Sequence, residues 1–170
     1  MEGAAVKRNY VAWYKVQTGI EKRPAVTNFR AREVWWCSLG ANIGFEEDGK
    51  NEPFERPVLI LRKFSAELFL GAPLTTKRKD NIFYHPIDIG GVTGSVMTSQ
   101  VRALSSRRLN RRLAHIGKGA FSQIAQKVTL LIDPEKSISA DFSAESPVPS
   151  GSLYSDDSKH EQKSQEEGGK

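Results

Sequence analysis

Two residue pairs in the sequence carry side chains that suit the binding of a phosphoryl group. Arg56-Pro57 opens the apolar run 57–64 after a long polar loop, and Thr75-Thr76 ends the apolar run 68–76 beside Lys77-Arg78-Lys79. A guanidinium presents a planar fork of donors that matches phosphate oxygens, and a hydroxyl can bond a further oxygen. Neighbouring strand ends would bring both groups to one phosphate. Such pairs also occur by chance, so the pattern alone leaves ordinary strand ends as an alternative.

Other kinds of site chemistry find little support in the sequence. His85, His115 and His160 lie far apart, and none has a second ligand at helical spacing, so neither a metal site nor a cofactor is expected. Cys37 is the single cysteine, which excludes a disulfide framework. Its place inside a strand-like run favours a buried apolar residue over a nucleophile. Glycine-rich phosphate-loop and dinucleotide-binding fingerprints are absent.

Basic residues are dense in the second half of the sequence. No acidic residue occurs between Ile89 and Ile132, so this stretch cannot neutralise itself through local ion pairs. It would present a positive surface to a nucleic-acid backbone, or else form an ordinary solvated face. The seven basic residues are Arg102, Arg107, Arg108, Arg111, Arg112, Lys118 and Lys127.

The net charge of the chain conceals two unlike parts. The 170 residues carry a net charge of +5, but residues 133–170 hold nine acidic and four basic residues, a net charge of −5. Residues 1–132 therefore carry +10, which favours an anionic partner such as nucleic acid. The acidic segment has nine Ser and few large apolar residues, so we expect a disordered tail.

The elements that must position these residues are mostly short strands. Residues 3–20 have apolar residues at near-helical spacing, residues 21–31 resemble a linker, and residues 121–132 predict a second amphipathic helix. Strands are expected at 33–39, 57–64, 68–76, 82–87 and 94–101, with two short strands or a turn in 102–116. The expected fold class is mainly β, a small antiparallel barrel or sandwich. No apolar run is long enough to cross a membrane, and the first residues lack the apolar core of a signal peptide. An intracellular, soluble protein is therefore expected.

Several motifs fall in the order found in one family. They are Glu33-Val-Trp-Trp-Cys-Ser-Leu-Gly40, Gly44-Phe-Glu-Glu47, Arg56-Pro-Val-Leu-Ile-Leu61, Pro73-Leu-Thr-Thr76, Gln100-Val-Arg102 and Arg107-Arg-Leu109. This set, over residues 32–132, resembles the MazF/PemK toxin endoribonucleases of bacterial type II toxin–antitoxin modules. The resemblance implies a small SH3-like β-barrel with a C-terminal helix, usually in a homodimer. Residues 1–31 would be an N-terminal helix and linker, and 133–170 a disordered tail.

What the family does gives the expected activity. Its members cleave single-stranded RNA without a metal: the ribose 2′-hydroxyl attacks phosphorus and leaves a 2′,3′-cyclic phosphate and a 5′-hydroxyl. A cognate antitoxin inhibits them, operator DNA is contacted only through that antitoxin, and the toxin acts in the cytoplasm. A non-catalytic SH3-like barrel that binds RNA, DNA or a peptide is the alternative, because a fold does not determine a function.

Individual site residues follow from the resemblance. Arg56 and Thr75 match the catalytic Arg and Thr. Glu46 matches a loop acid that would act as general base or hold Arg56, or else be a solvated acid of the loop. Family members often carry an acid where this chain has Ser99, which leaves the general base open. Trp35 and Trp36 alternate in a strand, so one would face the core and the other a base or a protein neighbour. The substrate-binding residues implied are Thr76, Lys77, Arg78, Lys79, Gln100 and Arg102.

Overall fold

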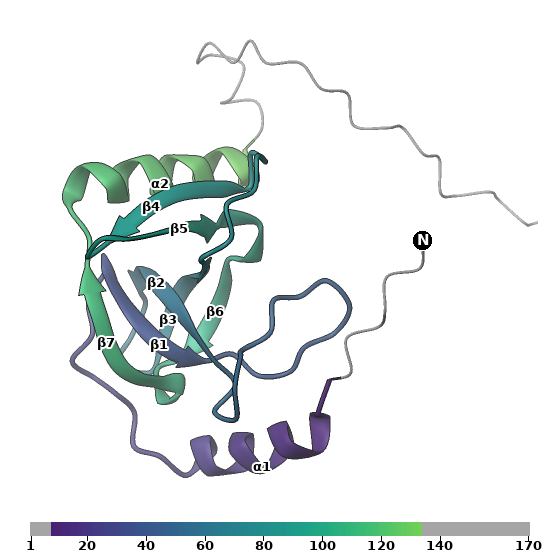
Figure 1. The fold of residues 1–170 in the computed structure, drawn as a ribbon. Coiled ribbons are helices and arrows are strands. Elements are labelled where there is room, and N and C mark those ends of the chain that lie inside the picture. Colours follow the sequence, from purple (N-terminus) through teal and green to yellow (C-terminus); the bar gives the residue numbers. More distant parts are fainter. Residues whose placement is uncertain (1–7, 134–170) are drawn as a thin grey trace, which may run out of the picture.

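The computed structural model describes residues 8–133 of the chain, drawn in colour in Figure 1. The first residues of the predicted N-terminal helix and nearly all of the predicted acidic tail lie outside the described residues. No helix among the described residues is long and apolar enough to cross a membrane.

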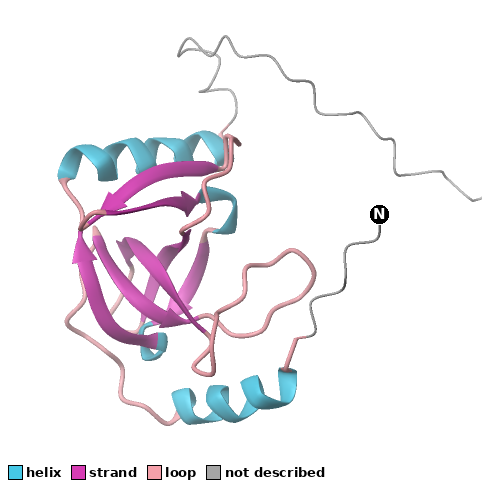
Figure 2. Cartoon of the chain, viewed as in Figure 1, coloured by secondary structure: helices cyan, strands magenta, loops and turns pink. Residues whose placement is uncertain are grey.

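The described chain forms one curled antiparallel sheet with a helix at each end of the molecule (Figure 2). The strands follow the order β4-β5-β3-β2-β1-β7, and β6 pairs with the first half of β3. This half-barrel with its C-terminal helix confirms the mainly β, SH3-like prediction. The strands are β1 (Glu33–Ser38), β2 (Glu55–Lys63), β3 (Leu68–Thr75), β4 (Tyr84–Ile89), β5 (Val92–Met97), β6 (Arg102–Ser105) and β7 (Leu109–His115).

The apolar run of β2 is buried on both faces of the sheet. Val58, Leu59 and Ile60 are each 0% exposed, and the two-residue period of a strand sends Leu59 to the face opposite its neighbours. Val58 and Ile60 belong to the core inside the curl, together with Cys37. Leu59 packs in a second core that includes Ile124 of helix α2 (Lys118–Ile132). A continuous apolar run is what such double burial requires.

Turn chemistry accounts for the strand boundaries that differ from prediction. The strand predicted to begin at Gly94 begins at Val92, because Gly90 and Gly91 take positive φ angles of 59° and 83° and make a tight hairpin turn with β4. It ends at Met97 rather than Val101, since Thr98–Gln100 (η1) forms a 3₁₀ turn. Residues 102–116 contain two strands, β6 and β7, separated by the 3₁₀ turn η2 (Ser106–Arg108).

Helix α1 (Tyr10–Glu21) lies at the end of the barrel opposite α2 (Figure 1). It starts at Asn9, whose side-chain oxygen accepts the N–H of Ala12 at 3.0 Å. The predicted helix is therefore present from Tyr10 to Glu21. Cys37 is fully buried in the core, as expected from its place in a strand, and burial raises the pKa of its thiol to about 12.

Candidate active site

Arg56 lies near the start of β2 and is almost fully enclosed, with 6% of its surface exposed. Its Nε donates to the carbonyl oxygen of Asp48 at 2.8 Å, and its Nη1 donates to the carbonyl oxygen of Leu74 at 3.2 Å. Nη2 forms an ion pair with the carboxylate of Glu47. Burial lowers the pKa of the guanidinium, while the charges of Glu47 and Asp48 oppose that change. The cation is thus held from both sides in one orientation.

Thr75 ends β3 beside Arg56. The register pairs Val58 with Pro73, so its continuation brings Thr75 opposite Arg56. The Thr75 hydroxyl oxygen accepts the N–H of Lys77 at 3.2 Å, which leaves the hydroxyl proton available to a ligand oxygen. The strand-end juxtaposition expected from the sequence is therefore present.

Arg56, Thr75 and Thr76 border a pocket of about 310 Å³. Its walls are mainly apolar and include Trp36. The guanidinium of Arg111 lies 4.8 Å from the centre of a Trp36 ring, so this indole packs against a cation. Trp35 packs at the edge of the inner core, as the alternation of a strand predicts. An apolar pocket with a cation and two hydroxyls at its border suits a ligand that combines a flat ring with a phosphate.

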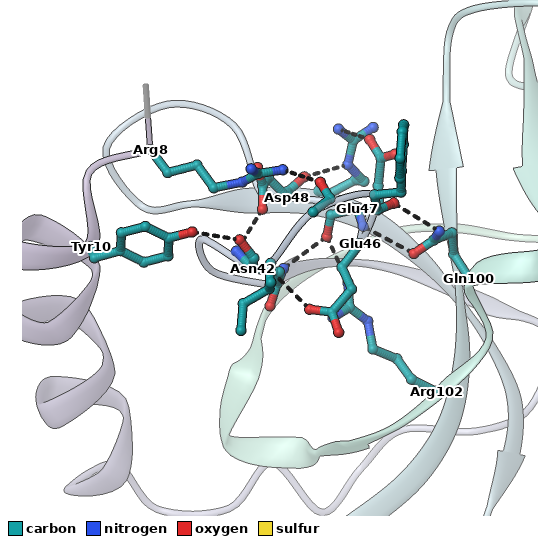
Figure 3. A network of polar contacts seen from close by, with 12 residues as sticks. Arg8, Tyr10, Asn42, Glu46, Glu47, Asp48, Gln100 and Arg102 are labelled. Carbon is teal, nitrogen blue, oxygen red and sulfur yellow. Dashed lines mark hydrogen bonds and ion pairs between the residues drawn. The ribbon is translucent and has the colours of Figure 1, made fainter. Parts of the chain in front are cut away.

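The acid that pairs with Arg56 is Glu47, not Glu46 (Figure 3). Gly44 has a φ of 55°, and the tight turn at Ile43 closes with the Glu46 N–H donating to the Ile43 carbonyl at 3.0 Å. The Glu46 carboxylate folds back within this turn and accepts the N–H of Ile43 at 3.1 Å. Its charge acts on Arg102: burial lowers the pKa of that guanidinium, and the Glu46 charge opposes this change. The expected role of Glu46 in holding Arg56 is therefore corrected to Glu47.

Gln100 and Arg102 hold the loop between β1 and β2, residues 39–54, which we call the β1–β2 loop (Figure 3). The Gln100 side chain accepts the N–H of Glu47 at 2.9 Å and donates to the carbonyl of Phe45 at 3.2 Å. Arg102 Nη2 donates to the Glu47 carbonyl at 2.6 Å, while its Nε is buried without a partner among the described residues. Both residues thus position the loop, and their direct contact with a substrate stays a prediction.

The basic cluster Lys77-Arg78-Lys79 follows Thr76 in an exposed segment. Lys79 Nζ bonds the hydroxyl of Tyr84 at 3.1 Å and lies 4.9 Å from the centre of that ring. Because Thr75 and Thr76 border the pocket, the cluster supplies positive charge along the same edge. This position at the edge of the pocket suits the substrate contact predicted for the cluster, which stays a prediction.

The basic residues of the stretch 102–127 form more ion pairs than the composition of the stretch predicts. The stretch itself contains no acidic residue, but acids from other parts of the chain lie beside it in the folded sheet. The prediction of a positive surface without compensating acids is therefore wrong for part of the stretch. Three of the arginines form ion pairs: Arg107 with Glu67 at 3.8 Å, Arg111 with Glu55 at 3.0 Å, and Arg112 with Glu33 at 3.1 Å. The positive charge of this stretch is therefore partly neutralised by acids from other parts of the sheet.

Sequence reasoning missed Glu47, Asp48 and the residues of the N-terminal segment that contact them. The run Glu46-Glu47-Asp48 ahead of Arg56 was a usable signal, because three adjacent acids before a buried Arg offer several partners.

Among the described residues, no group of three or more His, Cys, Asp or Glu side chains is placed to hold a metal ion.

Comparison with known proteins identifies the family. Residues 30–132 match the model of the PemK-like, MazF-like toxins of type II toxin–antitoxin systems, so the chain belongs to this family. The match confirms the resemblance drawn from the ordered motifs. No curated protein matches the chain.

Three solved structures resemble this chain, and the first supports its fold. The crystal structure of MazF from Deinococcus radiodurans has 23% identity and a TM-score of 0.52, with 61% of this chain and 96% of that chain covered. A MazE–MazF complex from the same organism has 21% identity and a TM-score of 0.47, covering 62% and 95%. A mycobacterial endoribonuclease in complex with its cognate antitoxin has 17% identity and a TM-score of 0.48, covering 60% and 92%.

Proposed function

We propose that this protein is a toxin endoribonuclease that cleaves single-stranded RNA without a metal ion. The observation that carries the proposal is the convergence of Arg56 and Thr75 at one border of the pocket, next to the basic residues 77–79. An RNA backbone supplies its own nucleophile, the 2′-hydroxyl. The protein therefore needs groups that align the attack, stabilise negative charge and transfer two protons.

The proposed reaction is a transesterification at phosphorus. The 2′-oxygen forms a bond to phosphorus and its proton goes to the Glu47 carboxylate. The bond from phosphorus to the 5′-oxygen then breaks, and Arg56 donates a proton to that leaving oxygen. Burial favours this donation because it lowers the pKa of the guanidinium. The proton on Glu47 returns to Arg56 across their ion pair, which restores both groups.

The other side chains bind and orient the substrate in this proposal. The free hydroxyl proton of Thr75 bonds a non-bridging phosphate oxygen, and Arg56 stabilises the charge that develops on the phosphorane. Thr76 and Lys77-Arg78-Lys79 follow the RNA backbone, while the apolar pocket takes a base. Products carry 2′,3′-cyclic phosphate and 5′-hydroxyl ends.

The same proposal includes the partners of the family. We expect a cognate antitoxin, a homodimer, contact with operator DNA only through the antitoxin, and action in the cytoplasm, where mRNA is translated. Complexes such as the mycobacterial endoribonuclease with its antitoxin support the first of these expectations. Co-expression with the adjacent reading frame, followed by co-purification, tests it directly.

The test of activity uses the full chain, a long RNA with single-stranded regions and excess EDTA. Primer extension maps the cut sites, and direct labelling by polynucleotide kinase without prior phosphatase treatment identifies 5′-hydroxyl ends. Replacing the guanidinium that stabilises the phosphorane, in Arg56→Ala, is expected to lower the cleavage rate about 100-fold or more. Arg62→Ala on the exposed end of the same strand is the matched control and is expected to cut normally.

Two outcomes would contradict the proposal. Cleavage that requires a divalent ion would exclude the metal-independent mechanism. RNA binding with no product after long incubation would instead favour the alternative of a non-catalytic SH3-like barrel.

A further inference from the structure

Helix α1 lies outside the region that matches the family, which begins at residue 30, yet it contacts the loop beside the candidate active site (Figure 1). The β1–β2 loop carries Glu47 and Asp48, the two residues that orient Arg56 from this side. The helix contacts this loop near its N-terminal end and the 3₁₀ turn η2 at its C-terminal end, where Arg107 Nη1 donates to the Glu21 carbonyl at 2.7 Å.

Two polar side chains at the start of α1 reach the loop (Figure 3). The Arg8 Nε bonds Asp48 Oδ2 at 2.7 Å, and Arg8 Nη2 donates to the Gly44 carbonyl at 2.6 Å. The hydroxyl of Tyr10 donates to the Asn42 carbonyl at 3.0 Å. Because the Asn9 cap fixes the first turn of the helix, these donors are presented together.

An apolar contact joins the middle of α1 to both ends of the loop. Trp13 is only 8% exposed, and the centre of one of its rings lies 5.5 Å from the centre of the Phe54 ring. A Cβ added to Gly40 would come within 2.5 Å of the indole, and Gly40 has a φ of 98°, so the backbone there is shaped to receive Trp13. The guanidinium carbon of Arg108 lies over the indole, 5.5 Å from the centre of a ring.

Asp48 connects these contacts to Arg56. Its carboxylate faces α1, with Oδ2 on Arg8 and Oδ1 accepting the N–H of Asn42 at 2.6 Å. Its carbonyl oxygen accepts the Arg56 Nε at 2.8 Å. Since one residue bonds the helix through its side chain and the guanidinium through its backbone, the position of α1 sets the position of that carbonyl.

We propose that Arg8, Tyr10 and Trp13 are positioning residues, and that α1 is a brace that holds the β1–β2 loop in the geometry that orients Arg56. The inference rests on the proposed function for its kinetic part. Gln100 and Arg102 hold the loop at Glu47, and α1 holds it at Asn42, Gly44 and Asp48. Without the brace, the loop keeps its contacts at Glu47 and loses those at Asn42, Gly44 and Asp48.

The test compares full-length Arg8→Gln and Tyr10→Phe with matched controls on the same helix or directly beside it. Lys22→Gln removes one positive charge from an exposed position, and Tyr14→Phe removes a hydroxyl from a side chain that is 67% exposed. Arg8→Lys keeps the charge and tests rescue. Loss of a partly exposed ion pair or of one hydrogen bond predicts hydrogen exchange in peptides covering 41–49 that is about three- to tenfold faster, with strand peptides unchanged.

The kinetic readout separates positioning from binding. With RNA cleavage as the assay, Arg8→Gln and Tyr10→Phe are expected to lower kcat about tenfold with little change in KM, because misorientation of Arg56 affects the transition state more than RNA binding. Arg8→Lys recovers part of the loss, and both controls match the wild type.

Each result decides a distinct part of the inference. Unchanged exchange in 41–49 overturns the brace, whatever the activity. Faster exchange with unchanged kcat overturns the positioning role. If the wild type cuts no RNA, the proposed function fails by itself, and the exchange data alone support or overturn the brace.

Discussion

Arg56 is a buried cation whose donors bond partners from both the β1–β2 loop and β3. The carbonyls of Asp48 and Leu74 accept from it, and the Glu47 carboxylate neutralises it. A buried charge is tolerated only when it is paired and hydrogen-bonded in this way. The same burial lowers the pKa of the guanidinium, which favours proton donation to a leaving oxygen.

At the residue scale, adjacent acids allow a sharp comparison. Glu47→Gln removes the carboxylate that pairs with Arg56, so we expect kcat to fall about 100-fold, the size of a lost general base. Glu46→Gln keeps that pair, and we expect a change of less than about threefold, within the effect of an exposed charge. Initial cleavage rates on one RNA measure both. A larger loss in Glu46→Gln would return the role to the residue that the family resemblance indicates.

Between elements, a buried carboxylate joins β7 to β1, the strand beside it. Glu33 of β1 is 5% exposed and accepts from Trp35 Nε1 at 2.9 Å, from the Arg30 N–H at 3.0 Å and from Arg112 at 3.1 Å. Burial by itself would raise the pKa of Glu33, but these hydrogen bonds outweigh it and lower the pKa below its ordinary value of 4.5. The charged form of Glu33 thus stabilises the β1–β7 pairing.

The lowered pKa predicts how stability depends on pH. A carboxyl with a depressed folded-state pKa contributes stability above its unfolded pKa and loses it as pH falls through the folded value. Glu33→Gln should therefore lower the free energy of unfolding by about 1–3 kcal/mol near neutral pH, because it leaves donors without their anion. The difference from wild type should shrink as pH falls below 4.5, the ordinary value for this group.

Urea unfolding measured near neutral pH and again in acid tests this prediction. The control is Glu67→Gln, whose side chain is 67% exposed and whose ion pair is 3.8 Å long. We expect the control to change stability by less than about 0.5 kcal/mol. A pH-independent loss in Glu33→Gln would show that the carboxylate charge does not matter there.

The charge of the whole molecule is divided between a basic body and an acidic C-terminal segment. Residues 1–133 contain 21 basic and 12 acidic residues, a net charge of +9, against +5 for the full chain. RNA binding should respond to this difference, because phosphate contacts are electrostatic and salt-dependent. The acidic segment could also compete with RNA for the basic surface, or act only through net charge.

Deletion of residues 134–170 is therefore expected to tighten RNA binding at low salt. The gain should diminish as salt rises, because screening shortens the range of both repulsion and competition to about 8 Å at physiological ionic strength. Fluorescence anisotropy with a labelled RNA across a salt series measures it, with Arg56→Ala as the background to prevent cleavage. Equal affinity of the two chains at every salt concentration would exclude any influence of the segment.

The sequence by itself determined the local features of this protein. The alternating and continuous apolar runs predicted β1, β2 and β3 nearly to their ends, and they placed Arg56 at the start of one strand and Thr75 at the end of the next. These features follow from nearest-neighbour patterns, because a strand has a two-residue period that is written directly in the chain. The ordered motifs then led to the family.

Only the tertiary structure decided which side chains meet. Glu47 rather than Glu46 reaches Arg56 because a turn at Gly44 redirects the loop, and turn geometry is not contained in residue type. The acids that neutralise the second-half arginines lie more than fifty residues away for Arg111 and farther for Arg112. Such pairs, like the contact of α1 with Asp48, form only after the sheet closes, so no local pattern in the sequence can show them.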